Sequence, residues 1–158
     1  MTDDYLKQVE AAYQGEVYGE AMYSAIAASM TDPVQAGKWH TLVELETRVK
    51  AVMRDVVARL GGDTTELESS GLRGLADAQN YIGLPWNELM SVFSSELDPV
   101  IAEYAALEKG CPPEDAPALR ALTEHEVVAK AFCEREMSGQ VDSSIEPVTS
   151  FLATLPDA

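Results

Sequence analysis

The sequence predicts an all-α fold, an antiparallel four-helix bundle with one long crossover between its second and third helices. Two observations lead to this prediction. Apolar residues recur at helical spacing in four long stretches of the chain. The links within the first and the second pair of stretches are about three and five residues long, whereas the link between the pairs has 24 residues. Short links make neighbouring helices antiparallel, and a long link lets the chain cross the bundle.

The first predicted hairpin spans residues 3–60. Its first helix is rich in Ala, Glu, Met and Tyr and runs to about Met30 without a proline. Asp32 and Pro33 then have the residue types of an N-cap and a first helical position. The second helix ends at the glycine pair that begins with Gly61, because glycine is the usual stop signal of a helix.

The second predicted hairpin spans residues 85–139. Pro85 opens the third helix, which ends near Gly110 ahead of a cysteine and two prolines. The fourth helix begins around Pro117 and ends near Gly139. The two predicted hairpins therefore have similar lengths and the same order of helices.

The remaining segments are a crossover and a tail. Residues 61–84 form the crossover. Fully extended, they reach roughly 80 Å, which exceeds the length of roughly 40 Å of a helix of this size. Residues 140–158 carry two prolines, and we expect them to pack back on the bundle as a loosely ordered segment. Residues 1–158 together predict a single domain.

The two hairpins carry an internal repeat. Aligning residues 42–53 with residues 122–133 gives five identities in twelve positions, at an offset of 80. The same offset places Glu16 on Glu96. We therefore predict that a pseudo-two-fold axis relates the two hairpins, and that one is an ancient copy of the other.

Glutamates interrupt the apolar stripes of the four helices. Glu16, Glu46, Glu96 and Glu126 each lie in the stripe of a different helix, and Glu20 lies one turn after the first of them. Packing the stripes together would bring the four carboxylates into the bundle interior. A buried carboxylate must be protonated, paired or bound to a metal ion. These glutamates are therefore the candidate site residues.

Three segments resemble the ferritin-like superfamily, and within it the small bacterial rubrerythrin-like proteins. GEVYGEAMY, residues 15–23, is similar to the first-helix segment whose glutamate binds metal in that group, and ELETRVK and EHEVVAK are similar to the second- and fourth-helix segments. The resemblance implies a di-iron carboxylate centre built from one Glu on each of two helices and a Glu-x-x-His pair on each of the other two. The glutamates at the matching positions are Glu16, Glu46, Glu96 and Glu126.

The histidines of that centre are replaced. Val49 and Ala129 stand where the two Glu-x-x-His motifs would place them. His125 precedes Glu126 by one residue, about 100° around the helix, so we expect it at the surface or between helices and not as a substitute ligand. His40 is expected on a solvated side.

Composition excludes two classes of partner. The chain has 27 Asp and Glu against 11 Lys and Arg, for a net charge of −16. This balance disfavours binding to nucleic acid and to an anionic membrane surface. No run approaches 18 uncharged apolar residues, and the acidic N-terminal segment is unlike a signal peptide. We therefore expect a cytoplasmic protein, and a homo-oligomer stays open.

Three functions stay open at this point. In the first, the carboxylates hold two divalent ions, iron or manganese, and carry out oxidation or peroxide chemistry on an unknown small-molecule substrate. In the second, the bundle is a metal-free ferritin-like relic that acts as a binding or assembly module, its core glutamates neutralised by Lys50 and Lys130. In the third, a cavity in the bundle binds a small apolar molecule.

Overall fold

The computed structural model describes residues 3–157, and within them every regular element is a helix and no strand occurs. The predicted all-α class is thereby confirmed. Four helices are long and two are short. They are α1 (Asp3–Ser29), α2 (Pro33–Arg59), α3 (Glu68–Ala78), α4 (Trp86–Gly110), α5 (Ala116–Met137) and α6 (Glu146–Leu152).

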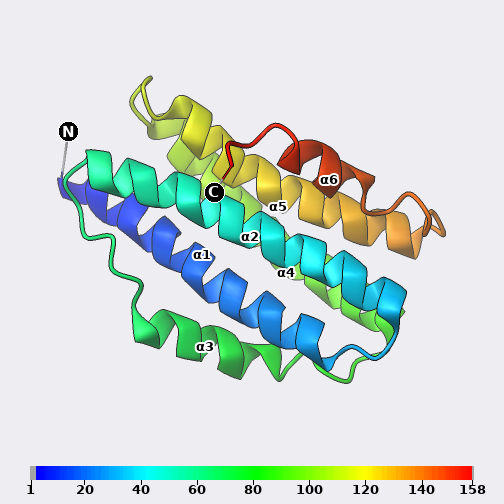
Figure 1. Ribbon diagram of the computed structural model, residues 1–158. Coiled ribbons are helices and arrows are strands. Elements are labelled where there is room, and N and C mark those ends of the chain that lie inside the picture. The colour runs from blue at the N-terminus through cyan, green and yellow to red at the C-terminus, as the bar shows by residue number, and fades with distance from the viewer. Residues whose placement is uncertain (1–2, 158) are drawn as a thin grey trace.

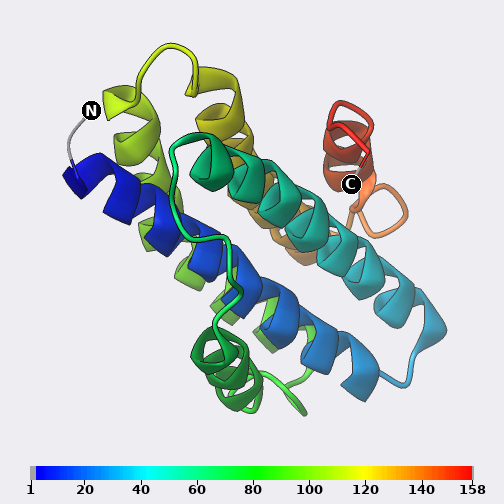
Figure 2. The same cartoon turned by 60° about the vertical axis from the view of Figure 1, so that its left-hand side comes forward.

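The four long helices lie side by side (Figures 1 and 2). α1 packs against α2, α4 packs against α5, and α2 also contacts α5. The long helices begin and end within two residues of the bounds expected from the sequence. Nowhere in residues 3–157 is a helix long and apolar enough to cross a membrane.

The turn between α1 and α2 shows why the helices begin where they do. Asp32 is extended, and its Oδ1 accepts hydrogen bonds from the backbone N–H groups of Val34 at 2.9 Å and Gln35 at 3.0 Å. These bonds satisfy two of the N–H groups that a helix start leaves unpaired. At the other end of α2, Gly61 has a φ of 78°, which residues with a side chain rarely adopt.

Aromatic side chains fill the part of the core where α1, α2 and α4 meet. Phe93 lies edge-on to both Tyr23 and Trp39, with ring centroids 5.2 Å apart in each pair. Trp39 in turn lies 6.3 Å from Trp86. Such perpendicular pairs add to the stabilisation from burial, so this cluster joins the two hairpins.

The crossover contains a helix that the sequence analysis did not predict. α3 lies along α1 (Figure 1). The backbones of α3 and α1 lie close together at Gly74, where an added Cβ would lie 2.3 Å from the carbonyl oxygen of Tyr18. The Tyr18 hydroxyl donates to Asp77 at 2.7 Å, and the Arg73 guanidinium lies 4.7 Å from the centre of the Tyr18 ring. Contacts with α1 therefore stabilise this short helix.

The tail does pack back on the bundle, but the expectation of a loosely ordered segment is wrong. It forms α6, which contacts α5 and α2 and buries Val148 and Phe151. The Arg48 guanidinium of α2 donates to the backbone carbonyls of Leu152 at 3.2 Å and Leu155 at 2.8 Å. Arg48 thus satisfies carbonyl groups at the end of α6, a position where a cation is favourable.

Candidate metal centre

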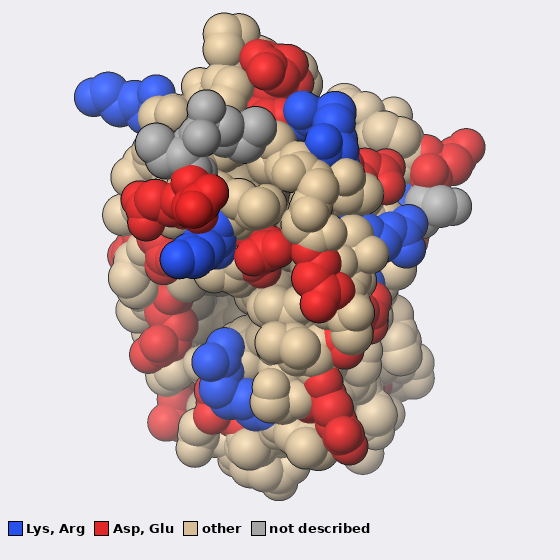
Figure 3. Space-filling view, turned by 90° about the vertical axis from the view of Figure 1, so that its left-hand side faces the viewer, with Lys and Arg blue, Asp and Glu red and all other residues tan. Residues whose placement is uncertain are grey.

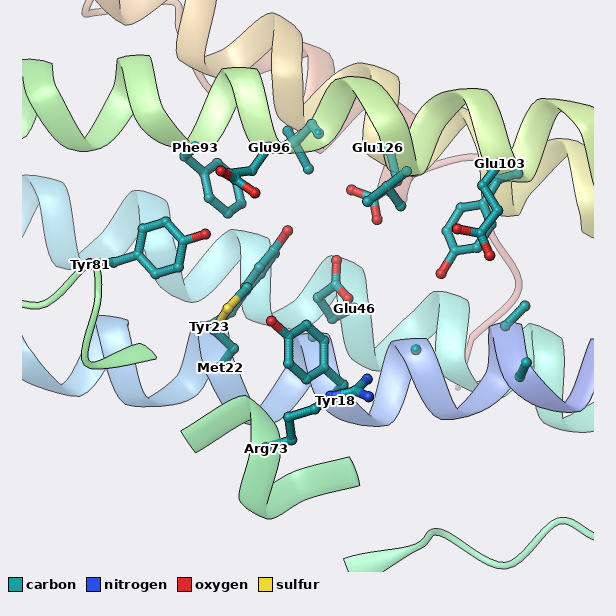
Figure 4. A pocket seen from close by; sticks show the side chains of 17 residues that line it. Tyr18, Met22, Tyr23, Glu46, Arg73, Tyr81, Phe93, Glu96, Glu103 and Glu126 are labelled. Carbon is teal, nitrogen blue, oxygen red and sulfur yellow. The ribbon is translucent and has the colours of Figure 1, made fainter. Parts of the chain in front are cut away.

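Three of the four predicted glutamates are buried and meet in the middle of the bundle. Glu16 on α1 is 1% exposed, Glu46 on α2 is 2% exposed and Glu126 on α5 is 6% exposed. Figure 4 shows the carboxylates of Glu46 and Glu126 pointing toward one another. Three carboxylates so placed repel one another, and burial makes each charge costly.

His125 is the fourth member of the group. The side chain is fully buried, and its Nε2 lies 3.1 Å from Glu16 Oε2 and 3.4 Å from a carboxylate oxygen of each of Glu46 and Glu126. His125 therefore lies between helices, one of the two positions expected, and it faces three glutamates from α1, α2 and α5. His125 shares one helical face with the buried Leu122 and Ala129, and this position turns its ring toward the bundle interior.

A backbone carbonyl orients the His125 ring. Nδ1 lies 2.5 Å from the carbonyl oxygen of Leu122, one turn earlier in α5. A carbonyl only accepts, so Nδ1 carries the proton and donates. In the neutral ring Nε2 then has a free lone pair directed at the three carboxylates. The same arrangement is usual for histidines that bind metal ions.

Each of the four side chains has one buried polar atom without a hydrogen-bond partner among the residues described. These atoms are Glu16 Oε2, Glu46 Oε1, Glu126 Oε2 and His125 Nε2. Buried polar atoms left unpaired cost free energy, and a cation placed between these atoms would satisfy them together. Glu16, His125 and Glu126 each offer a ligand atom, and the three atoms lie within 4.8 Å of one another. This group could hold a metal ion.

The proton affinities reflect the crowding. Burial, and then the neighbouring Glu16 carboxylate, raise the pKa of Glu46 well above its usual value. Burial also raises the pKa of Glu126, to about 7. For His125 burial alone would lower the pKa, but the adjacent carboxylates outweigh it and raise the pKa well above 6.5. Without a cation the group therefore retains protons near neutral pH.

Two other candidates lie outside this group. Glu96 is exposed, and Figure 4 shows it next to Phe93. The expectation that all four glutamates converge therefore fails at Glu96. The half-buried Glu20 carboxylate accepts from the Thr47 hydroxyl at 2.6 Å and from the Lys50 ammonium at 2.9 Å, so it is already paired outside the centre.

The two lysines do not neutralise the core glutamates. Lys50 pairs with Glu20 and with Glu66, the latter at 2.7 Å. Lys130 pairs with Asp98 and, at 3.9 Å, with an exposed glutamate one turn along α5. Their long side chains reach outward to acids on the surface. The hypothesis that these two lysines neutralise the core glutamates of a metal-free bundle is therefore wrong.

The sequence did carry a signal for His125. Leu122, His125, Glu126 and Ala129 have the i, i+3, i+4, i+7 spacing of one buried helical face. All four are buried. If every position of the buried face of this helix had been considered, and not only the third residue after the glutamate, His125 would have been predicted beside Glu126.

Two glycines of α1 allow the site to assemble. A Cβ on Gly19 would lie 2.2 Å from Glu46 Oε2, so only a residue without a side chain leaves room for that carboxylate. A Cβ on Gly15 would lie 2.8 Å from the Tyr104 hydroxyl oxygen. That hydroxyl donates to the other oxygen of Glu16, at 3.3 Å. α1 is therefore shaped to accept groups from α2 and α4.

A cavity of about 300 Å³ connects the centre with the surface between α1 and α4. Glu46 and Glu126 line its inner end (Figure 4). A small molecule in this cavity would lie next to the carboxylates. No protein-family model, curated protein or solved structure matches the chain. The chemistry of the centre is therefore inferred from its own geometry.

Proposed function

We propose that the protein is a metal-dependent oxidoreductase whose ion is held by Glu16, Glu46, Glu126 and His125 and acts on a small molecule in the adjoining cavity. The observation that supports a metal ion is the meeting of four buried side chains around His125 Nε2, each with one polar atom that has no partner among the residues described. An imidazole whose other nitrogen is bonded to a carbonyl has the orientation of a metal ligand.

The donor set favours iron or manganese. Carboxylates are typical ligands of manganese and magnesium, and an imidazole moves the preference toward iron and other transition metals. Glu16, His125 and Glu126 could hold one divalent ion between them, and the neighbouring Glu46 is proposed as a further ligand. A second ion would need Glu96, which lies outside the group. We therefore propose one tightly bound ion in place of the two expected from the sequence.

The residues around the ion would have defined roles. A redox-active ion would supply oxidation–reduction chemistry to a molecule in the cavity. The carbonyl of Leu122 fixes the direction of His125, and the Tyr104 hydroxyl fixes that of Glu16. The surrounding apolar core limits the access of water to these groups.

We also propose that the fold is a ferritin-like bundle derived from a duplicated hairpin. Two antiparallel pairs joined by a long connection support this proposal. Glu46 and Glu126, which the 80-residue offset aligns, are both buried in the same cluster. Glu16 and Glu96, the other aligned pair, differ in burial, so the two halves have diverged most at the cavity.

A metal-free bundle is the second candidate. The 3.1 Å between His125 Nε2 and Glu16 Oε2 also suits a protonated imidazole, whose positive charge would offset one carboxylate. In that case the protein would be a binding module, and His125, not a lysine, would neutralise the core.

Metal titration of the purified protein tests the proposal. The chain is stripped with a chelator, and Mn²⁺ uptake is followed by the loss of the free-ion signal in electron paramagnetic resonance. Fe²⁺ is titrated without oxygen, and oxygen or peroxide consumption is then measured. We expect one ion per chain. Glu16→Gln and His125→Gln should each weaken binding at least tenfold, because each removes a ligand.

Glu124→Gln is the matched control, since Glu124 is an exposed neighbour of His125 on α5. It should bind Mn²⁺ like the parent. Unchanged binding in a folded His125→Gln variant would overturn the proposed centre. If the parent protein binds no ion, the second candidate remains, in which the metal-free bundle is a binding module.

A further inference from the structure

The cavity has a second end that the metal centre does not use. Tyr81, Phe93, Tyr23 and Glu96 line it, on the side away from Glu126 (Figure 4). The rings stand nearly at right angles. Phe93 makes angles of 68° with Tyr23 and 82° with Tyr81, at centroid distances of 5.2 and 6.2 Å. This end of the cavity, called the aromatic end below, is therefore lined by rings that pack edge to face on Phe93.

Two hydroxyls at this end have no partner. Tyr23 is only 3% exposed, yet within the described part of the chain its hydroxyl makes no hydrogen bond, and the same holds for Tyr81. Figure 4 shows both hydroxyls turned into the cavity. Tyr81 is half-buried, and both tyrosines line the cavity. These two groups are therefore available to a ligand.

The charge of the cavity is negative. Four glutamates line it, including the exposed Glu96 and Glu103. Arg73 is the one basic residue among the described residues that line it, and its guanidinium lies against the Tyr18 ring. The face of the molecule in Figure 3 also shows more Asp and Glu than Lys and Arg, with both kinds interspersed. Such a field attracts cations and repels anions.

We propose that the aromatic end of this cavity binds an organic ammonium ion, with the nitrogen between Glu96, Tyr81 and Tyr23. An ammonium group has three N–H donors and no acceptor, and these three side chains offer oxygen acceptors. Aromatic faces attract cations through the ring quadrupole. The apolar part of the ligand then lies along Leu97 and Val100, which also line the cavity.

The hydroxyl of Tyr81 stays neutral in this setting. Burial and the nearby Glu96 carboxylate raise the pKa of Tyr81. A neutral phenol can accept from an ammonium while donating to the carboxylate, so the acid and the phenol can act together. The inference does not rest on the metal centre, because Glu96, Tyr81 and Tyr23 are not among the proposed ligands.

An NMR titration of the full chain with labelled tyrosine rings tests the proposal. It is done with the metal-free protein and with protein whose proposed metal centre is loaded with Zn²⁺, which is diamagnetic. The probes are n-butylammonium, the neutral butan-1-ol and the anion butyrate. We expect butylammonium to bind at least tenfold more tightly than the other two, to shift the ring signals of Tyr81 and Tyr23, and to bind equally in both preparations.

Variants locate the contact. Glu96→Gln should weaken butylammonium binding about tenfold, the typical loss of a charge-assisted hydrogen bond. Glu88→Gln, an exposed glutamate on the same helix, should leave it unchanged. Tyr81→Phe should weaken it severalfold, and zinc binding should persist in all three variants.

Other results would overturn the proposal. Tighter binding of butyrate that Arg73→Gln abolishes would make the cavity an anion site. Equal binding of the three probes would make it merely apolar. Loss of butylammonium binding on zinc loading would place the ammonium among the central carboxylates, and an unaffected Glu96→Gln variant would remove the proposed acceptor.

Discussion

The protein buries carboxylates in two different ways. Asp115 and Glu136 are buried and fully partnered. Asp115 accepts from the Tyr5 hydroxyl at 2.7 Å and pairs with Arg59. Glu136 pairs with Lys38 and accepts from Trp86 Nε1 at 3.1 Å and the Ser144 hydroxyl at 2.8 Å.

Among residues 3–157, no lysine or arginine pairs with the central glutamates Glu16, Glu46 and Glu126. The lysines that follow two of these glutamates by one turn, Lys50 and Lys130, reach outward to surface acids. The comparison shows that the chain can supply a lysine or an arginine to a buried acid where the acid serves stability. At the centre it supplies a histidine and leaves oxygen atoms free, as a ligand site requires.

The largest effect is expected at a partnered acid. Glu136→Gln removes the charge that balances Lys38, whose side chain is mostly buried. Breaking such a pair leaves an uncompensated charge and should lower the free energy of unfolding by about 3–5 kcal/mol. Urea unfolding measures the change. Glu134→Gln, at an exposed position on the same helix, should stay near the parent, and equal losses in both variants would contradict the distinction.

The central acids should give the opposite response to pH. Because the folded state raises the pKa of Glu126 from 4.5 to about 7, it holds a proton that the unfolded chain releases. Stability of the metal-free protein should therefore fall as pH rises from about 4.5 to about 7, by about 3 kcal/mol for this group. The raised pKa of His125 acts in the same direction.

With bound metal the stability should instead rise with pH, because the ligands bind the ion in their deprotonated forms. Thermal unfolding between pH 5 and 8, with and without Mn²⁺, tests both statements. Glu126→Gln should flatten the slope of the metal-free protein. A stability that rises with pH in the metal-free parent would contradict the crowding inferred for the centre.

A smaller effect is expected from the glycine that admits Glu46. Gly19→Ala puts a methyl group where Glu46 Oε2 lies, so the carboxylate must move and Mn²⁺ affinity should fall about tenfold or more. Gly37→Ala is the control, because no atom lies within 4 Å of its added Cβ. It should leave affinity unchanged and stabilise α2 by about 0.5–1 kcal/mol. Similar affinities in the two variants would show that Glu46 is not a ligand.

The smallest effect is expected at Tyr104. Tyr104→Phe removes the hydroxyl that donates to Glu16 at 3.3 Å and leaves the ring stacked near His125. Metal affinity should fall only severalfold, since the hydrogen bond is long and the ligand itself remains. Calorimetric titration with Mn²⁺ can resolve this change. A loss as large as that of Glu16→Gln would make Tyr104 a ligand and not a positioning residue.

Much of the fold could be predicted from the sequence, because the helices are bounded by strong local signals. Asp32, Pro33 and Gly61 mark the first turn and the end of α2, and all three act in the structure as their residue types predict. α3 could not be predicted in this way. Its turn at Gly74 is stabilised by contact with the backbone of Tyr18, which no local pattern reveals.

The site was predicted less completely, for a similar reason. The stripe positions of Glu16, Glu46 and Glu126 follow from helical spacing, and the three are buried together. Glu96 occupies the stripe of α4 by the same spacing, but a cavity lies between α1 and α4, so its side is exposed. Helical spacing tells which side of a helix a residue occupies, and only the packing of helices tells whether that side is covered.

The bond between His125 and the Leu122 carbonyl bears on how buried clusters of histidine and glutamate are found in other sequences. A search pattern written as Glu-x-x-His passes over this protein, because its histidine precedes the glutamate. The spacing Leu-x-x-His-Glu-x-x-Ala brings an imidazole to the same carboxylates from the other side of the motif. A pattern that allows a histidine on either side of the glutamate would find both arrangements.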